Sequence, residues 1–203
     1  PRRGRPLTGG ANRVCLDRAM VTMGANFGHC DKDGFLYFHA GTGNTQMETL
    51  IPNRMFRNAA GRVFHDITAS GGLGHLQKGH GVAFADLDND GDQDVYAVMG
   101  GAYTGDTYPN VLFENPGHGN QWVTLRLTGV RSNRSSIGAR VRVPERRASG
   151  GPDRVLPRVV SSGGIFGASS LQLEVGLGRA AAIPRIEVDW PSGQQQRWED
   201  VPM

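Results

Sequence analysis

The chain has 203 residues, of which 38% are hydrophobic and 20% are charged, with 30 glycines and 11 prolines. This composition is typical of a soluble globular protein with many turns, in one or two domains. The net charge is +3, but the 22 basic residues are interspersed with 19 acidic ones and form no basic stripe, which argues against a nucleic-acid partner. No apolar run approaches the length of a transmembrane segment.

Residues 1–22 show little periodicity, with three arginines in the first five positions and a Gly-Gly turn. We expect an extended arm or the end of a preceding unit. The chain starts at Pro1 without a signal-peptide pattern, so a secretion signal either has been removed or lies upstream. Cys15 and Cys30 form one bridge or remain thiols, and we favour thiols because Cys30 takes the place of an apolar loop residue.

An acidic loop appears first at residues 29–37, HCDKDGFLY, and returns in fuller form at residues 86–94, DLDNDGDQD. The two glycines, Gly34 and Gly91, lie 57 positions apart, a period within reach of a β-propeller blade that carries an added loop. The first copy has His29 and Tyr37 where the second has aspartates. We therefore predict that the first loop keeps the turn but holds no ion.

The second loop concentrates five aspartates at alternate positions. Like charges this close repel one another, so a fold that gathers them favours a divalent cation with several oxygen ligands. Carboxylates at positions 1, 3, 5 and 9, a glycine at position 6 and a backbone carbonyl at position 7 match the spacing of a calcium loop. The predicted metal residues are Asp86, Asp88, Asp90, Asp92 and Asp94, of which Asp92 offers its backbone oxygen and the others their side chains.

This loop is not an EF-hand, because position 12 is Ala97 instead of a bidentate glutamate and the flanking residues alternate as strands do. Two alternatives remain. The loop could be a solvated acidic hairpin whose Asp-Gly merely turns the chain, or it could hold magnesium, which usually takes fewer protein ligands. We favour calcium over both.

Each loop is followed by two strand-like segments in the same order. LYFHAGTG and DVYAVMGG end in glycine turns, and PNRMFRN and PNVLFEN both begin with Pro-Asn. In the first repeat RVFHDIT adds another strand, which gives four short antiparallel strands per unit, the content of a propeller blade. The link between the repeats holds His75 and His80, which could suggest a transition-metal site, although we favour a connecting turn whose imidazoles bond to backbone.

From Gln121 onward the pattern changes to a clean alternation, QWVTLRLTG, followed by further short strand-like segments separated by Gly, Ser and Pro clusters. About six antiparallel strands in a sandwich are expected. The predicted organisation is therefore an arm or preceding unit at 1–22, two repeats at 23–120 and a terminal β domain at 121–203.

The FADLDNDGDQD loop, its weaker partner and the segment NRMFRNAAGRVFHDIT resemble the FG-GAP or VCBS repeats of calcium-binding propellers in secreted and surface proteins. The segments NRSSIGARVRV, SSGGIFGASSLQLEVGLG and IEVDWPSG resemble the ASPIC/UnbV domain that closes proteins similar to cartilage acidic protein. The resemblance implies an all-β chain, a partial β-propeller of about two blades followed by an antiparallel β-sandwich-like domain. Such propellers have about seven blades.

No nucleophile-and-base signature, HExxH motif or GxSxG elbow occurs in the sequence. We expect a non-enzymatic, Ca²⁺-binding module outside the cytoplasm (secreted, cell-surface or periplasmic) that binds a protein or glycan partner and packs against further blades or other subunits. One alternative is a structural subunit of a larger complex. Another is the non-catalytic part of an enzyme whose active site lies on missing blades.

Overall fold

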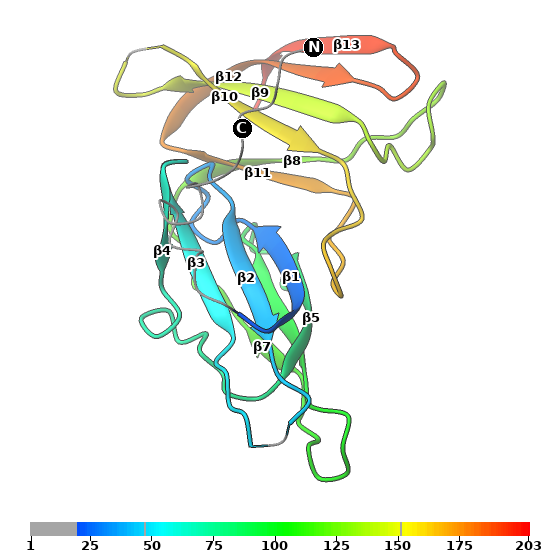
Figure 1. Cartoon of the computed structure of the whole chain (residues 1–203). Coiled ribbons are helices and arrows are strands. Elements are labelled where there is room, and N and C mark those ends of the chain that lie inside the picture. Colours follow the sequence, from blue (N-terminus) through cyan, green and yellow to red (C-terminus); the bar gives the residue numbers. More distant parts are fainter. Residues whose placement is uncertain (1–19, 47, 151) are drawn as a thin grey trace, which may run out of the picture.

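The computed structural model describes residues 20–46, 48–150 and 152–203. Within them all regular structure is β-strand, arranged in four antiparallel sheets that form a lower and an upper lobe (Figure 1). The all-β fold class predicted from the sequence is confirmed. None of the described residues belongs to a helix that could cross a membrane. The predicted arm at residues 1–22, together with Cys15, lies almost wholly outside the described residues.

The first sheet of the lower lobe is an antiparallel meander in which each strand pairs with the next along the chain. Its strands are β1 (Thr22–Gly28), β2 (Tyr37–Thr42), β3 (Arg54–Ala59) and β4 (Val63–Asp66). This is the four-stranded unit that the sequence predicts. Its register is shown by three aromatic residues that lie side by side, Phe27 opposite Phe38 and Phe38 opposite Phe56.

The second sheet of the lower lobe has three strands in the described residues, one fewer than the repeat predicts. They are β5 (Gly79–Ala85), β6 (Asp94–Met99) and β7 (Val111–Phe113). After β7 the chain reads Asn-Pro-Gly, in which Pro116 has no N–H to donate and Gly117 adopts a φ of 76°. The chain therefore leaves the sheet here and crosses to the upper lobe.

The Pro-Asn motifs have the same structural role in both sheets. The side-chain oxygen of Asn53 accepts the backbone N–H of Thr42 at 2.8 Å, and that of Asn110 accepts the N–H of Met99 at 3.2 Å. Each asparagine thus accepts the backbone N–H of the last residue in the second strand of its sheet. The repeat in sequence is therefore a repeat in structure. Between the sheets lies a small core of five buried side chains: Tyr37, Met55, Val82, Phe84 and Val95.

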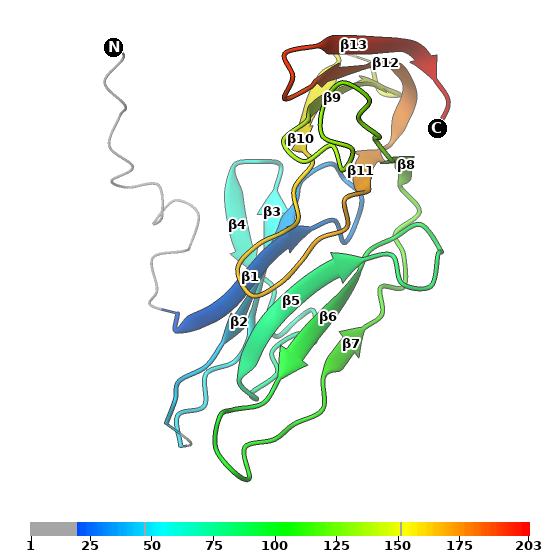
Figure 2. The same cartoon turned by 90° about the vertical axis from the view of Figure 1, so that its right-hand side faces the viewer.

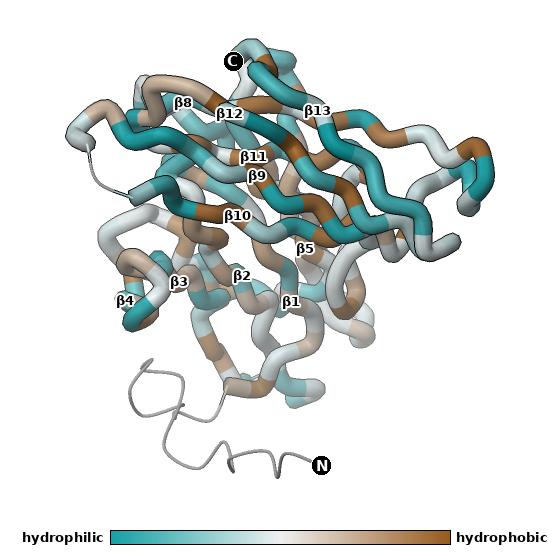
Figure 3. Tube along the Cα trace, turned by 90° about the horizontal axis from the view of Figure 1, so that it is seen from above, coloured by the Kyte–Doolittle hydropathy of each residue, from teal (hydrophilic) through white to brown (hydrophobic). Residues whose placement is uncertain are grey.

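The upper lobe consists of six strands in two sheets, as the sequence predicts. Strands β8 (Gln121–Leu125) and β11 (Leu173–Gly178) form a ribbon, and the other sheet has the order β10-β9-β12-β13. The bounds of its strands are Arg140–Arg147 for β9, Arg154–Val159 for β10, Ala180–Asp189 for β12 and Gln195–Val201 for β13. Seen from above, hydrophobic and hydrophilic segments alternate along these strands (Figure 3).

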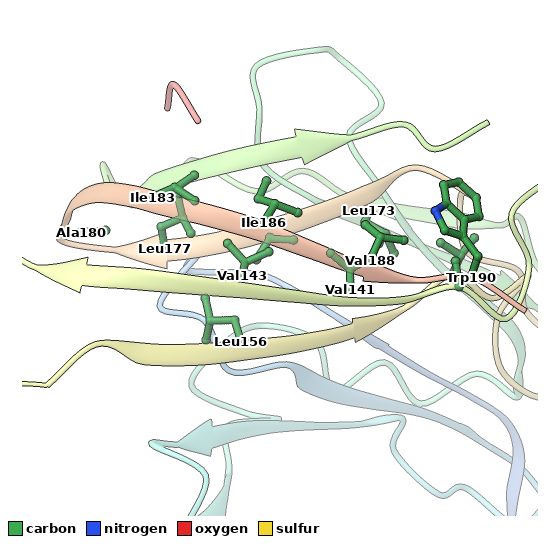
Figure 4. Close-up of a cluster of buried hydrophobic side chains, with 13 residues drawn as sticks. Val141, Val143, Leu156, Leu173, Leu177, Ala180, Ile183, Ile186, Val188 and Trp190 are labelled. Atoms are coloured by element: carbon green, nitrogen blue, oxygen red, sulfur yellow. The ribbon is translucent and has the colours of Figure 1, made fainter. Parts of the chain in front are cut away.

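The core of the upper lobe is larger, with 13 buried residues. Val141 and Val143 from β9 lie beside Ile183 and Ile186 from the neighbouring β12, and Leu177 from β11 packs against them from the other sheet (Figure 4). The inner sides of β9, β11 and β12 are therefore buried between the two sheets, which is the arrangement of a β-sandwich, while β13 is exposed along most of its length. The ribbon β8–β11 is the layer nearest the lower lobe (Figure 1).

A long loop between β10 and β11 leaves the upper lobe and reaches down to β1 (Figure 2). Ile165 in this loop forms an antiparallel bridge with Ala25, with N–H to oxygen distances of 2.9 and 3.1 Å. Two glycines allow the close approach, because a Cβ added at Gly164 would lie 2.1 Å from the oxygen of Ala25 and one at Gly167 1.9 Å from that of Val82. The lobes are thus joined through backbone contacts.

Candidate metal site

The loop at residues 86–94 connects β5 to β6 and folds through left-handed residues and side-chain turns. Asn89 and Gly91 have φ values of 63° and 89°. Asp88 accepts the N–H of Asp90 at 3.2 Å, and Asp90 accepts the N–H of Asp92 at 3.0 Å, so each of these aspartates holds the backbone two residues on. The alternation of aspartate therefore gives the loop its curvature as well as its charge.

Three of the five predicted residues come together in this loop. Asp86, Asp88 and Asp90 each offer a carboxylate oxygen within 4.8 Å of the others. The Oδ2 atom of Asp86 accepts the N–H of Gly91 at 3.1 Å, and its Oδ1 atom is buried without a hydrogen-bond partner. Clustered carboxylate oxygens with a buried, unpartnered member fit a hard cation such as Ca²⁺.

The other two predicted residues are buried and contact different groups. Asp94 accepts the N–H of Leu87 at 3.2 Å and that of Asn115 at 2.9 Å, so it ties the start of β6 to both the loop and the chain after β7. Asp92 is 3% exposed, and its Oδ2 lies 3.9 Å from the Nζ of Lys32. Burial, and then the charge of Asp90, raises the pKa of the Asp92 carboxyl, while Lys32 opposes that rise.

The loop at residues 29–37 has the same backbone shape. Lys32 and Gly34 have φ values of 56° and 94°, matching Asn89 and Gly91, and Asp31 accepts the N–H of Asp33 at 3.1 Å as Asp88 does that of Asp90. The prediction that this copy keeps the turn is confirmed. The prediction that it holds no ion remains a prediction.

What differs is how the aspartate of the first loop is neutralised. The Oδ2 of Asp31 accepts a hydrogen bond from the hydroxyl of Tyr37 at 2.9 Å and one from Arg57 at 3.1 Å. In the second repeat the residue that corresponds to Arg57 is Glu114, 57 positions later. The first repeat therefore supplies a cation to its loop from strand β3, and the second repeat has another carboxylate at the corresponding position.

His29, at the first position of this loop, is not available as a cation. Its Nε2 lies 2.5 Å from the Nη2 of Arg158 on β10, and its side chain is buried. Burial, and then the charges of Arg158 and Arg154, lowers its pKa to about 3. The imidazole is therefore neutral at pH 7 and belongs to the contact between the lobes.

Four consecutive backbone oxygens of the first loop accept hydrogen bonds from the end of the lower lobe or from the upper lobe. Asn120 donates to Asp31 at 2.6 Å and the N–H of Gly178 to Lys32 at 2.7 Å. Arg154 donates to Asp33 at 2.7 Å and Arg158 to Gly34 at 3.1 Å. The first loop has become a docking element.

Sequence reasoning missed the residues of this junction, among them Lys32, Trp122, Arg158 and Glu174. One signal pointed to Lys32, since it and Lys78 are the two lysines of the chain. The imidazoles of His75 and His80 bond to backbone as expected: the Nδ1 of His75 accepts the N–H of Gln77 at 3.2 Å, and the Nε2 of His80 lies 2.5 Å from the oxygen of Gly100. His80, however, belongs to strand β5 and not to a connecting turn.

The fold and its loops define a class of protein: two blade-like sheets, each with an acidic loop between its first two strands, followed by a β-sandwich. Two family models match parts of the chain. Residues 30–97 match the FG-GAP-like repeat, and residues 129–203 match the ASPIC and UnbV domain. The chain is thus an FG-GAP-like repeat protein with an ASPIC and UnbV domain at the C-terminal end of the sequence, as the resemblance implies. No significant match was found among curated proteins.

Proposed function

We propose that this chain is a non-enzymatic, Ca²⁺-binding module that acts outside the cytoplasm and binds a protein or glycan partner. One observation carries the calcium assignment: three carboxylates converge in residues 86–94, whereas in the first loop Arg57 neutralises Asp31 and Tyr37 donates a hydrogen bond to it. Unneutralised carboxylates at this separation would repel one another, and a bound divalent cation removes that cost.

The proposed ligands are the side chains of Asp86, Asp88 and Asp90, with the backbone oxygen of Asp92 at the seventh position of the loop. When bound, calcium would supply a fixed positive charge that ties the end of β5 to the start of β6. Asp94 orients the loop through its two backbone hydrogen bonds. The role is structural, as in a metal staple.

The proposed location follows from the expected affinity. A loop without the closing glutamate of an EF-hand should bind calcium weakly, with a dissociation constant of about 10⁻⁴ to 10⁻³ M, as extracellular modules do. FG-GAP-like repeats are typical of extracellular proteins, which supports the same proposal. A nanomolar dissociation constant would contradict it.

One face of the second sheet supports the proposal of a packing partner. Tyr96 and Leu112 lie opposite each other on β6 and β7, and together with Val98 they expose 38 to 51% of their surface. Apolar side chains grouped on one sheet face are usually covered by another layer. We propose that a further blade, from this chain or from another subunit, covers this face.

The calcium assignment can be tested with a matched pair of variants. Asp90→Asn removes a charge but keeps the oxygen that accepts the N–H of Asp92, and Asp33→Asn makes the same change at the corresponding position of the first loop. Calorimetry on chelator-treated protein should show one binding event that Asp90→Asn weakens or abolishes and Asp33→Asn leaves intact.

Thermal unfolding gives an independent measurement of the same site. At calcium a hundredfold above the dissociation constant, binding to the native state alone adds about 2.7 kcal/mol. For a chain of this size that corresponds to roughly 5 to 10 °C in Tm. An unchanged Tm on adding saturating calcium would refute the proposed stabilising role of the ion.

A further inference from the structure

The ribbon β8–β11 of the upper lobe rests on the candidate metal loop as well as on the first loop. Trp122 of β8 lies over Gly91, and a Cβ added to that glycine would be 2.2 Å from the Cζ2 of the indole. The ring of Trp122 also lies 3.9 Å from the Nζ of Lys32, which in turn lies 3.9 Å from Asp92. Trp122 therefore contacts both loops at once.

A partly buried carboxylate of the upper lobe faces the same loop. Glu174 lies opposite Thr124 in the ribbon and lines the same cavity as Gln93, which lies between Asp92 and Asp94. Its Oε2 is buried without a partner. Burial raises the pKa of Glu174, the side-chain amide of Gln93 opposes this rise, and the negative charge of Asp86 adds to it. Negative charge thus faces negative charge across the junction, and Lys32 offsets both sides in part.

We propose that cation binding at residues 86–94 and seating of the C-terminal domain on that loop are thermodynamically linked. A bound divalent cation neutralises the charge that opposes Glu174, and it fixes Gly91, the surface on which Trp122 rests. The linkage rests on the proposed calcium site, and it assigns that site a second role, which is to stabilise the contact between the two lobes. Because linkage is reciprocal, a change that loosens the seat weakens calcium binding without touching a ligand.

Tryptophan fluorescence tests the first half of the linkage in the full chain. Trp190→Phe with Trp198→Phe leaves Trp122 as the sole tryptophan, and Trp122→Phe with Trp190→Phe leaves Trp198, which lies on β13 in the outer sheet. Calcium should change the emission of the Trp122 chain and leave that of the Trp198 chain unchanged. Equal responses, or no response at Trp122 while calorimetry shows binding, would overturn the linkage and leave the calcium site standing.

Calorimetry tests the reciprocal half. Trp122→Ala removes the contact with Gly91 and Lys32 but no oxygen ligand, and Trp198→Ala removes a side chain of similar exposure, 44% against 37%. We expect Trp122→Ala to weaken calcium binding on the order of tenfold, within the usual range of coupling between two sites, and Trp198→Ala to have no such effect. Equal affinities in the two variants would contradict the linkage.

A charge variant decides the question should Trp122→Ala fail to fold. Glu174→Gln keeps the shape of the side chain but removes the repulsion, and Glu199→Gln on β13 is the matched control. In the chain with Trp122 alone, Glu174→Gln should reduce the emission change that calcium produces, while Glu199→Gln should not. An undiminished change in Glu174→Gln refutes the linkage, and absence of calcium binding to the parent chain refutes the linkage and the proposed site together.

Discussion

Single residues separate the two loops more than their backbones do. His29 stands where the second loop has Asp86, Tyr37 where it has Asp94, and Arg57 where it has Glu114. Each exchange removes an acidic group from the first loop or adds a basic one. The two loops therefore share one backbone shape and differ in the charges at corresponding positions.

His39 on β2 offers a prediction about pH. Burial lowers its pKa from 6.5 to about 4, and neither ring nitrogen has a hydrogen-bond partner in the described residues. A base whose folded pKa is lowered favours the neutral state, so this contribution to stability is lost as pH falls from 6.5 towards 4. The loss should reach about 3 kcal/mol.

Replacing this histidine should flatten the pH dependence. Urea unfolding between pH 7 and pH 4 is the measurement, with His39→Leu compared with the parent chain and with His65→Leu, a change of an exposed histidine on β4. A residual slope is expected in His39→Leu, because the pKa of His29 is lowered in the same direction. The full parental slope in His39→Leu would show that His39 is not the group responsible.

Whole elements were predictable from the sequence where a local pattern determines them. The turn of each loop follows from Asx side chains and a glycine, and the strands follow from alternation. The missing fourth strand of the second sheet was not predictable, because PNVLFEN repeats the frame of PNRMFRN up to the residues that follow. The positions of Asp92 and Asp94 were not predictable either, since their partners Lys32 and Asn115 come from elsewhere in the chain.

Restoring charge to the first loop should restore metal binding. The triple variant His29→Asp, Tyr37→Asp, Arg57→Glu gives the first loop aspartates at the positions that match Asp86, Asp88, Asp90 and Asp94, while Gly34 keeps the turn. Calorimetry should then show two calcium ions per chain. The double variant that retains Arg57 should bind the second ion more weakly, because the guanidinium still donates a hydrogen bond to the Asp31 carboxylate. A single ion in the triple variant would show that shape and charge do not suffice.

At the scale of the molecule, the two lobes differ in how well each could stand alone. The upper lobe encloses a core of 13 buried residues, whereas the core between the lower sheets has five. The existence of two lobes was visible in the change of pattern at Gln121. Their junction was not, because it joins backbone atoms, glycines and side chains such as Arg154 and Arg158 that lie far apart in the sequence.

Separate expression of the two parts should expose this difference. Residues 121–203 should give a soluble monomer with a cooperative melt, because the sandwich has its own core. Residues 1–120 should aggregate or oligomerise, because the face with Tyr96, Val98 and Leu112 and the strand edges stay open. Size-exclusion chromatography and thermal denaturation check both expectations. A monomeric, protease-resistant fragment 1–120 would contradict the partial-propeller interpretation.

The three successive carbonyl groups of residues 32–34 that accept hydrogen bonds from the upper lobe also bear on how this loop can change in sequence. Carbonyl groups are the same in every amino acid, so the contact depends on the path of the chain and not on the identity of the side chains. Substitution at Tyr37 therefore leaves these carbonyl acceptors in place, whereas substitution at His29 also removes the contact of its imidazole with Arg158. Gly34 is under a different constraint, because its φ of 94° fixes that path. A duplicated loop can in this way lose the residues for binding a metal and still keep its contact with the upper lobe.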